Sequence, residues 1–317
     1  EMGERMVAAA HTAGINITLI PVFYQKGGFG IEPQARQRRF ISRTIEDYLH
    51  LLDDSAEVVR RHAHAKLGFS VHSLRAVNLH DIVATHDQGP KNIPFHLHIA
   101  EQKKEVEDCL AFTKQRPVEW LLNNLPVDGR FHLVHATHLT DEEVLGLAKA
   151  KADVVLCPST EGNLGDGIFK MKSYVKHGGK WCIGTDSHIG LNPLEEFRMI
   201  DYRQRLITNQ RNTFEGDAAA YMVQSEITNG RVAMGLGDTA PFTIGEAFHA
   251  VVYNSAAPLL ANTSKEKLMA SIVYATDSSM VSGTIMNGKW IVKDNNHIRG
   301  EAIQNAFAKA IQSINNR

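Results

Sequence analysis

The sequence has few cysteines, no long apolar run and no excess of charge of one sign. Its three cysteines, Cys109, Cys157 and Cys182, form no C-x-x-C pair, which predicts a reducing, cytoplasmic compartment without a disulfide framework. No stretch reaches the roughly 18 apolar residues that a membrane-spanning helix needs. Lysine and arginine (34) nearly balance aspartate and glutamate (35). This balance argues against a nucleic-acid or membrane-surface binder, although it allows a local basic pocket for a small acidic substrate.

The chain alternates between apolar strand-like segments and helical patterns. Six strand-like segments are each followed by a helical pattern: residues 15–24, 67–71, 94–99, 131–135, 152–157 and 180–184. Their regular repeat predicts an α/β fold, a TIM-like (β/α)8 barrel with a buried parallel sheet. No G-x-G-x-x-G follows a strand, which disfavours a doubly wound sheet. Because residues 1–7 resemble the middle of an amphipathic helix, we expect the first two barrel strands to be missing, upstream of Glu1.

The pattern changes near residue 238. Further strand-like segments lie at residues 242–246, 250–253, 280–286 and 289–292. The last two flank Asn287-Gly288, a strong signal for a β-hairpin. The predicted parts are a partial metal-dependent hydrolase barrel over 1–237, a small β-sandwich remnant over 238–300 and a C-terminal helix over 301–317.

Histidines and acids stand at the ends of several predicted strands, where barrels carry their catalytic side chains. His98, Glu101, His135 and Asp186 each lie at or just after such an end. A histidine near a carboxylate suits a metal ligand beside a proton carrier. An ionised aspartate directly after a buried strand needs a metal or several hydrogen-bond donors. Taken singly, each residue is also compatible with a packed core histidine, a helix-start acid or a loop cap.

Two further motifs contain histidines. His72 and Arg75 follow a predicted strand, and arginine can hold a carboxylate through two hydrogen bonds; a solvated helix start is the alternative. His62 and His64 have the H-x-H form of a metal-binding strand. We expect these two residues to be helical, so that their side chains point about 200° apart and cannot bind one metal together.

The order of these residues, together with the sequence around them, resembles that of a known family. The motifs are Gly28-Phe29-Gly30, Phe69-x-x-His72-Ser73-Leu74-Arg75, His98-x-x-Glu101, His135-Ala136-Thr137-His138, Cys157-Pro158-Ser159-Thr160-Glu161-Gly162-Asn163 and Thr185-Asp186-Ser187-His188. They resemble the amidohydrolase superfamily, and more narrowly its N-formimidoyl-L-glutamate (formiminoglutamate) deiminases of histidine degradation. The resemblance runs from the first residues to about 206 and returns near Asn287.

This resemblance implies one Zn2+ ion and a set of residue roles. The implied roles are His98 and Asp186 as metal ligands, Glu101, His135 and Asp186 as catalytic residues, and His72 and Arg75 as substrate-binding residues. The family's H-x-H ligand pair would lie upstream of Glu1, so we expect an incomplete ligand set. The implied reaction converts N-formimidoyl-L-glutamate to N-formyl-L-glutamate and ammonia, in a homo-oligomer, a dimer, when full length.

Two other functions stay open at this point. A related deaminase acting on guanine or a purine-like ring would need an aromatic wall and not a cationic pair beside its pocket. An inactive truncated barrel is the second alternative, because catalytic zinc sites normally use about three protein ligands.

Overall fold

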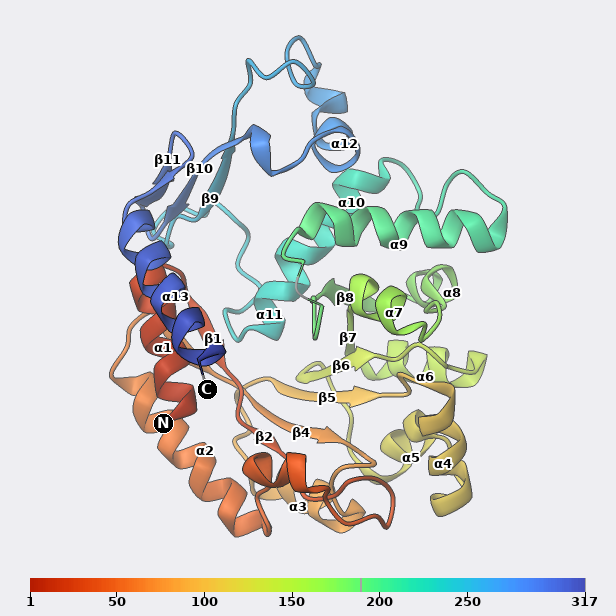
Figure 1. The fold of residues 1–317 in the computed structure, drawn as a ribbon. Coiled ribbons are helices and arrows are strands. Elements are labelled where there is room, and N and C mark those ends of the chain that lie inside the picture. Colours follow the sequence, from red (N-terminus) through yellow and green to blue (C-terminus); the bar gives the residue numbers. More distant parts are fainter. Residues whose placement is uncertain (189, 317) are drawn as a thin grey trace.

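The centre of the computed structural model, which describes residues 1–188 and 190–316, is a six-stranded parallel sheet ordered β2-β4-β5-β6-β7-β8 (Figure 1). Its strands are β2 (Val22–Phe23), β4 (Phe69–Ser73), β5 (Phe95–Ile99), β6 (Phe131–His135), β7 (Asp153–Leu156) and β8 (Lys180–Ile183). The predicted α/β fold with a parallel central sheet is confirmed. In the described part of the chain β2 and β8 are the outer strands, so the closed eight-stranded barrel stays a prediction.

The first two predicted strands are each divided in two. Their first halves, β1 (Ile17–Leu19) and β3 (Ala65–Leu67), pair in parallel with each other. Their second halves, β2 and β4, join the main sheet. Pro21 lies between β1 and β2, where its missing N–H interrupts the ladder of hydrogen bonds.

Helices follow the strands in sequence and pack side by side, α1 on α2, α2 on α3, α4 on α5 and α5 on α6 (Figure 1). They are α1 (Met2–Ala13), α2 (Ile45–Arg60), α3 (Leu79–Gln88), α4 (Lys103–Thr113), α5 (Pro117–Asn124), α6 (Asp141–Ala150), α7 (Pro158–Leu164), α8 (Met171–Lys176), α9 (Pro193–Thr208), α10 (Ala218–Ser225) and α11 (Arg231–Ala233), with the short segments η1 (Ala35–Phe40) and η2 (Glu226–Gly230). Within the described ranges, no helix has the length and apolar character that crossing a membrane requires.

Buried phenylalanines mark the face of the sheet that packs into the apolar core. Phe69, Phe95 and Phe131 begin three neighbouring strands in register, and their ring centroids are 4.6 and 5.2 Å apart. All three are fully buried. Side chains alternate along a strand, so the next residue, such as His96, points to the opposite face. The sequence alternation therefore separates an apolar outer face from a polar inner face.

The chain after residue 238 forms an antiparallel sheet of four strands, ordered β12-β11-β10-β9. The strands are β9 (Ala250–Tyr253), β10 (Val281–Met286), β11 (Lys289–Lys293) and β12 (Asn296–His297), accompanied by α12 (Lys265–Ala275), η3 (Ser278–Met280) and α13 (Gly300–Asn315). Asn287 and Gly288 both have positive φ (49° and 73°), as the hairpin signal predicts. Within the described residues this region forms one sheet, and its assignment as a β-sandwich remnant stays a prediction. Arg317, the end of the predicted terminal helix, and Ile189 of the predicted barrel lie outside the described residues.

The strand expected at residues 242–246 is not formed. Phe242 and Gly245 have φ angles of 61° and 93°, which an extended strand cannot accommodate. Ile244 between them is fully exposed. The apolar residues of this segment are therefore not a sign of a buried strand. The limits of the three predicted parts stay predictions.

A row of polar residues crosses the inner face of the main sheet. Ser70, His96, His132, Asp153 and Lys180 occupy one register on five neighbouring strands. His132 and Asp153 are buried, with Nδ1 and Oδ2 3.5 Å apart. Burial raises the pKa of Asp153 to about 7 and lowers the pKa of His132 to about 2. The pair is therefore largely uncharged below pH 7.

We predict that Asp153→Asn changes the pH dependence of stability. The raised pKa means that the stability from the protonated carboxyl is complete at low pH and is lost as the pH rises through about 7. Asparagine cannot ionise. Between pH 5 and pH 8.5 the free energy of unfolding of the variant, measured by urea unfolding, should therefore rise relative to that of the wild type by about 2.7 kcal/mol.

Asp53→Asn, at an exposed position on α2, is the matched control and should show no such trend. A difference between Asp153→Asn and the wild type that does not vary with pH would contradict the interpretation.

Candidate active site

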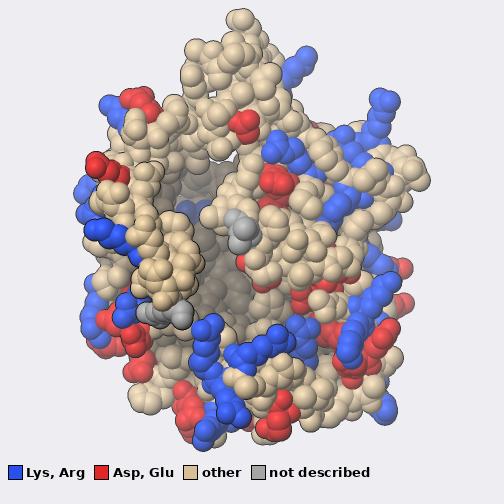
Figure 2. Space-filling view, in the orientation of Figure 1, with Lys and Arg blue, Asp and Glu red and all other residues tan. Residues whose placement is uncertain are grey.

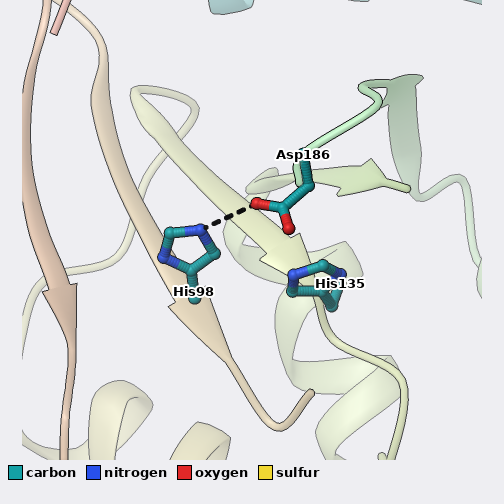
Figure 3. Close-up of side chains that lie close together, drawn as sticks. All are labelled: His98, His135 and Asp186. Atoms are coloured by element: carbon teal, nitrogen blue, oxygen red, sulfur yellow. Dashed lines mark ion pairs between the residues drawn. The ribbon is translucent and has the colours of Figure 1, made fainter. Parts of the chain in front are cut away.

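The predicted site residues lie at the carboxyl ends of parallel strands. His98 lies near the end of β5, His135 ends β6, and Asp186 follows β8 by three residues (Figure 3). Glu101 follows β5, and His72 lies near the end of β4. These ends meet at one edge of the sheet, where barrels of this type place their catalytic side chains.

Three side chains converge closely enough to hold a metal ion. One ligand atom from each of His98, His135 and Asp186 lies within 4.8 Å of the other two. His98 Nε2 is 3.4 Å from Asp186 Oδ1, and the three side chains point toward a common centre (Figure 3). Two imidazoles and one carboxylate form a donor set that fits zinc. The sequence predicts His98 and Asp186 as ligands and His135 as a catalytic residue; the geometry adds His135 to the candidate ligands.

Neighbouring contacts orient His98 for such a role. Its Nδ1 lies 2.8 Å from the carbonyl oxygen of His72 and donates a hydrogen bond to it, which leaves Nε2 facing Asp186. This arrangement is typical of histidines that bind metals. The contact with His98 holds the pKa of Asp186 at about 2, so its carboxylate is ionised at neutral pH.

The backbone is strained at the same edge of the sheet. Ala100, His135, Ala136 and Asp186 all have positive φ, between 49° and 72°. Residues other than glycine rarely adopt this region, and each such residue costs on the order of 1–3 kcal/mol. Strained residues that cluster at strand ends are typical of functional sites, where the fold holds side chains in a required position.

The sequence prediction overlooks Glu161, a fully buried carboxylate on α7. Its Oε1 is 3.5 Å from His135 Nδ1 and accepts a hydrogen bond from the backbone N–H of Cys157 at 2.9 Å. Its Oε2 accepts a hydrogen bond from Arg203 at 2.6 Å. Burial alone would raise the pKa of Glu161, but its contacts with His135 and Arg203 hold that pKa below the usual range. The available signal was a glutamate in the first turn of the helix that follows a buried strand, within the segment Cys157-Pro158-Ser159-Thr160-Glu161.

Carboxylates lie near both ring nitrogens of His135 and affect its pKa. Burial lowers its pKa, but Glu161 and the charge of Glu101 outweigh that effect and raise it. His135 Nε2 is 3.7 Å from Glu101 Oε1. With Nδ1 turned toward Glu161, Nε2 faces the metal candidates and Glu101.

Arg75 contacts acidic residues of the site. Its guanidinium is 3.5 Å from Glu101 and 3.6 Å from Glu105. Both distances exceed an ordinary hydrogen bond, so N–H groups stay available for another acceptor. Burial, His98 and Arg75 lower the pKa of His72 to about 3, so this histidine is neutral. The roles of His72 and Arg75 in substrate binding stay predictions.

His62 and His64 are not part of this group. Helix α2 ends at Arg60 and both histidines lie in the turn before β3, so the helical spacing expected for them is wrong. His72 follows His64 by eight positions of nearly continuous strand, and at about 3.3 Å per position this puts His62 and His64 roughly 25 Å from the site.

Comparison with known proteins yields consistent relatives. The sequence profile of the amidohydrolase family matches residues 5–291. A formimidoylglutamate deiminase of Pseudomonas aeruginosa is 37% identical over 321 residues, which cover 99% of this chain and 70% of that protein. The crystal structure of an amidohydrolase from Brucella melitensis superposes with a TM-score of 0.88 at 34% identity, covering 98% of this chain and 69% of the other. An adenosine deaminase from Xanthomonas campestris with bound zinc shares the fold, with a TM-score of 0.83, 21% identity and coverage of 98% and 69%.

We predict that Glu161→Gln weakens zinc binding by this chain about 10- to 100-fold, because neighbours of a metal-binding histidine tune it by that amount. Glutamine keeps the size of the side chain but loses the charge that faces His135 and Arg203. Isothermal titration with zinc measures the effect.

Glu107→Gln, an exposed glutamate on α4, should leave the zinc affinity unchanged. Equal affinities for the wild type and Glu161→Gln would show that Glu161 does not act on the site.

Proposed function

The chain belongs to the amidohydrolase family, and we propose that it carries the active site of a zinc-dependent deiminase that acts on N-formimidoyl-L-glutamate in histidine degradation. The convergence of His98, His135 and Asp186 at one edge of the parallel sheet carries the proposal. The 37% identity to a formimidoylglutamate deiminase supports the choice of substrate. The products would be N-formyl-L-glutamate and ammonia.

The residues around this centre suit hydrolysis of an amidine carbon. Bound zinc would supply a water activated for attack at neutral pH. Asp186, ionised and adjacent to His98, accepts the proton of the attacking water. Glu101 and Asp186 together pass the two protons of that water to the leaving nitrogen, whose bond to carbon breaks to release ammonia. His135 faces the same centre through Nε2 as a candidate ligand, and Glu161 holds its ring in place at Nδ1. Acid–base assistance of this kind is typically worth ~10²–10⁴-fold in rate.

Cationic groups near the site suit an acidic substrate. Tyr24, directly after β2, packs edge-on against the ring of His72, with the centroids 4.6 Å apart, and its hydroxyl accepts a hydrogen bond from Gln37 of η1. Gln37 thus links η1 to the edge of the site, and the next two residues, Arg38 and Arg39, are exposed. Within the described ranges, no carboxylate lies within 4.0 Å of either guanidinium. Lysine and arginine side chains gather along the lower rim of the central hollow in Figure 2.

A comparison of substrates tests the proposed function. With zinc present, the chain should release ammonia from N-formimidoyl-L-glutamate and not from guanine or adenosine. Glu101→Gln and Asp186→Asn should each lower kcat by at least about 100-fold, because each loses a proton-transfer group. The exposed Glu107→Gln serves as the control.

Ammonia from a purine alone would overturn the proposed substrate. A zinc-loaded chain that releases ammonia from none of these compounds would contradict the proposal for this chain and favour an inactive barrel.

The double substitution Arg38→Gln/Arg39→Gln should lower kcat/KM for the acidic substrate about three- to tenfold at low salt, through loss of electrostatic steering. The difference from the wild type should vanish near 1 M NaCl, where charges are screened beyond about 3 Å. Arg5→Gln and Arg60→Gln, at exposed arginines of α1 and α2, are the controls. A deficit that persists at high salt would contradict a steering role.

A further inference from the structure

Three histidines gather on the protein surface, away from the active site. His11 lies in the last turn of α1, and His62 and His64 lie in the turn between α2 and β3. The ring centroids are 5.0 Å apart for His11 and His64, 5.4 Å for His62 and His64, and 6.5 Å for His11 and His62. Three imidazoles from two separate segments therefore occupy one small region.

The turn is what permits this arrangement. On a helix, residues two apart point in nearly opposite directions. Because α2 ends at Arg60, the rings of His62 and His64 instead lie side by side. His11 is brought against them by the packing of α1 on α2.

One of the three rings makes a hydrogen bond of the kind that many metal-binding histidines make. His64 Nε2 lies 3.1 Å from the carbonyl oxygen of Val7 and can donate a hydrogen bond to it. This bond fixes the proton on Nε2 and leaves Nδ1 with a free lone pair, as in many metal-binding histidines. His11 is exposed and His62 is half-buried, so neither ring is enclosed by the core.

We propose that His11, His62 and His64 form a second metal site, which binds a divalent transition ion of the Zn2+, Ni2+ or Cu2+ class. Imidazole is a preferred ligand of these ions, and three histidines with water in the fourth position form a known coordination set. Binding requires the rings to rotate until their nitrogens lie on one ion. The ion would then link α1 to the turn before β3.

Binding of Ni2+ to tag-free protein tests the proposal. Asp186→Asn serves as the background, so that the candidate active site contributes little to the signal. His11→Asn, His62→Asn and His64→Asn, each added singly, should all weaken Ni2+ binding at least tenfold, because each removes one of three ligands. His50→Asn, at an exposed histidine of α2, should leave it unchanged.

Two further readouts separate a site from nonspecific binding and from misfolding. Bound Cu2+ should show an electron paramagnetic resonance signal with coupling to three nitrogens, reduced to two in each variant. Ni2+ should raise the Tm of the background protein and not that of the variants, since the ion stabilises the state that binds it. Far-ultraviolet circular dichroism checks that each variant is folded.

Loss of Ni2+ binding in only one of the three variants, or in none, would overturn the proposal. So would copper coordinated by a single nitrogen. Failure of the deiminase assay would leave the proposal unaffected, because it rests on different residues.

Discussion

The register of the parallel strands brings the candidate catalytic group together. Ile99 of β5 pairs with His135 of β6, and Leu156 of β7 pairs with Ile183 of β8. This register places the ends of β5, β6 and β8 at one edge of the sheet. Because His98, His135 and Asp186 lie at or just after these ends, their side chains come within reach of one ion. A slip of one residue would turn every side chain of the slipped strand to the other face. The buried phenylalanines in register on the outer face oppose such a slip.

The site also depends on buried charge that is held by paired contacts. Glu161 is fully buried, and such a carboxylate is tolerable only because Arg203, His135 and the N–H of Cys157 surround it. Further down the inner face, burial instead leaves His132 and Asp153 largely uncharged. The inner face thus has ionised side chains at the strand ends and uncharged side chains below them. The charged groups are therefore concentrated at the candidate active site.

Much of the fold and the centre of the site could be predicted from the sequence. Apolar runs located the six parallel strands, and strand-end histidines and acids located His98, His135 and Asp186. The contacts of Glu161 could not be predicted, because Arg203 reaches it from a helix about 40 residues further along. The strand predicted at residues 242–246 is wrong because the apolar residues of this segment lie on the surface. The helical spacing predicted for His62 and His64 is wrong because α2 ends earlier than its sequence pattern predicts.

The central claim is that His98, His135 and Asp186 form a metal centre. A crystal of this chain grown with zinc, measured at the zinc absorption edge, tests it most directly. We predict an anomalous peak within about 2.3 Å of His98 Nε2 and of an Asp186 carboxylate oxygen, with His135 facing it. A structure in which the chain is folded, zinc is bound elsewhere and these three side chains face no peak would contradict the account.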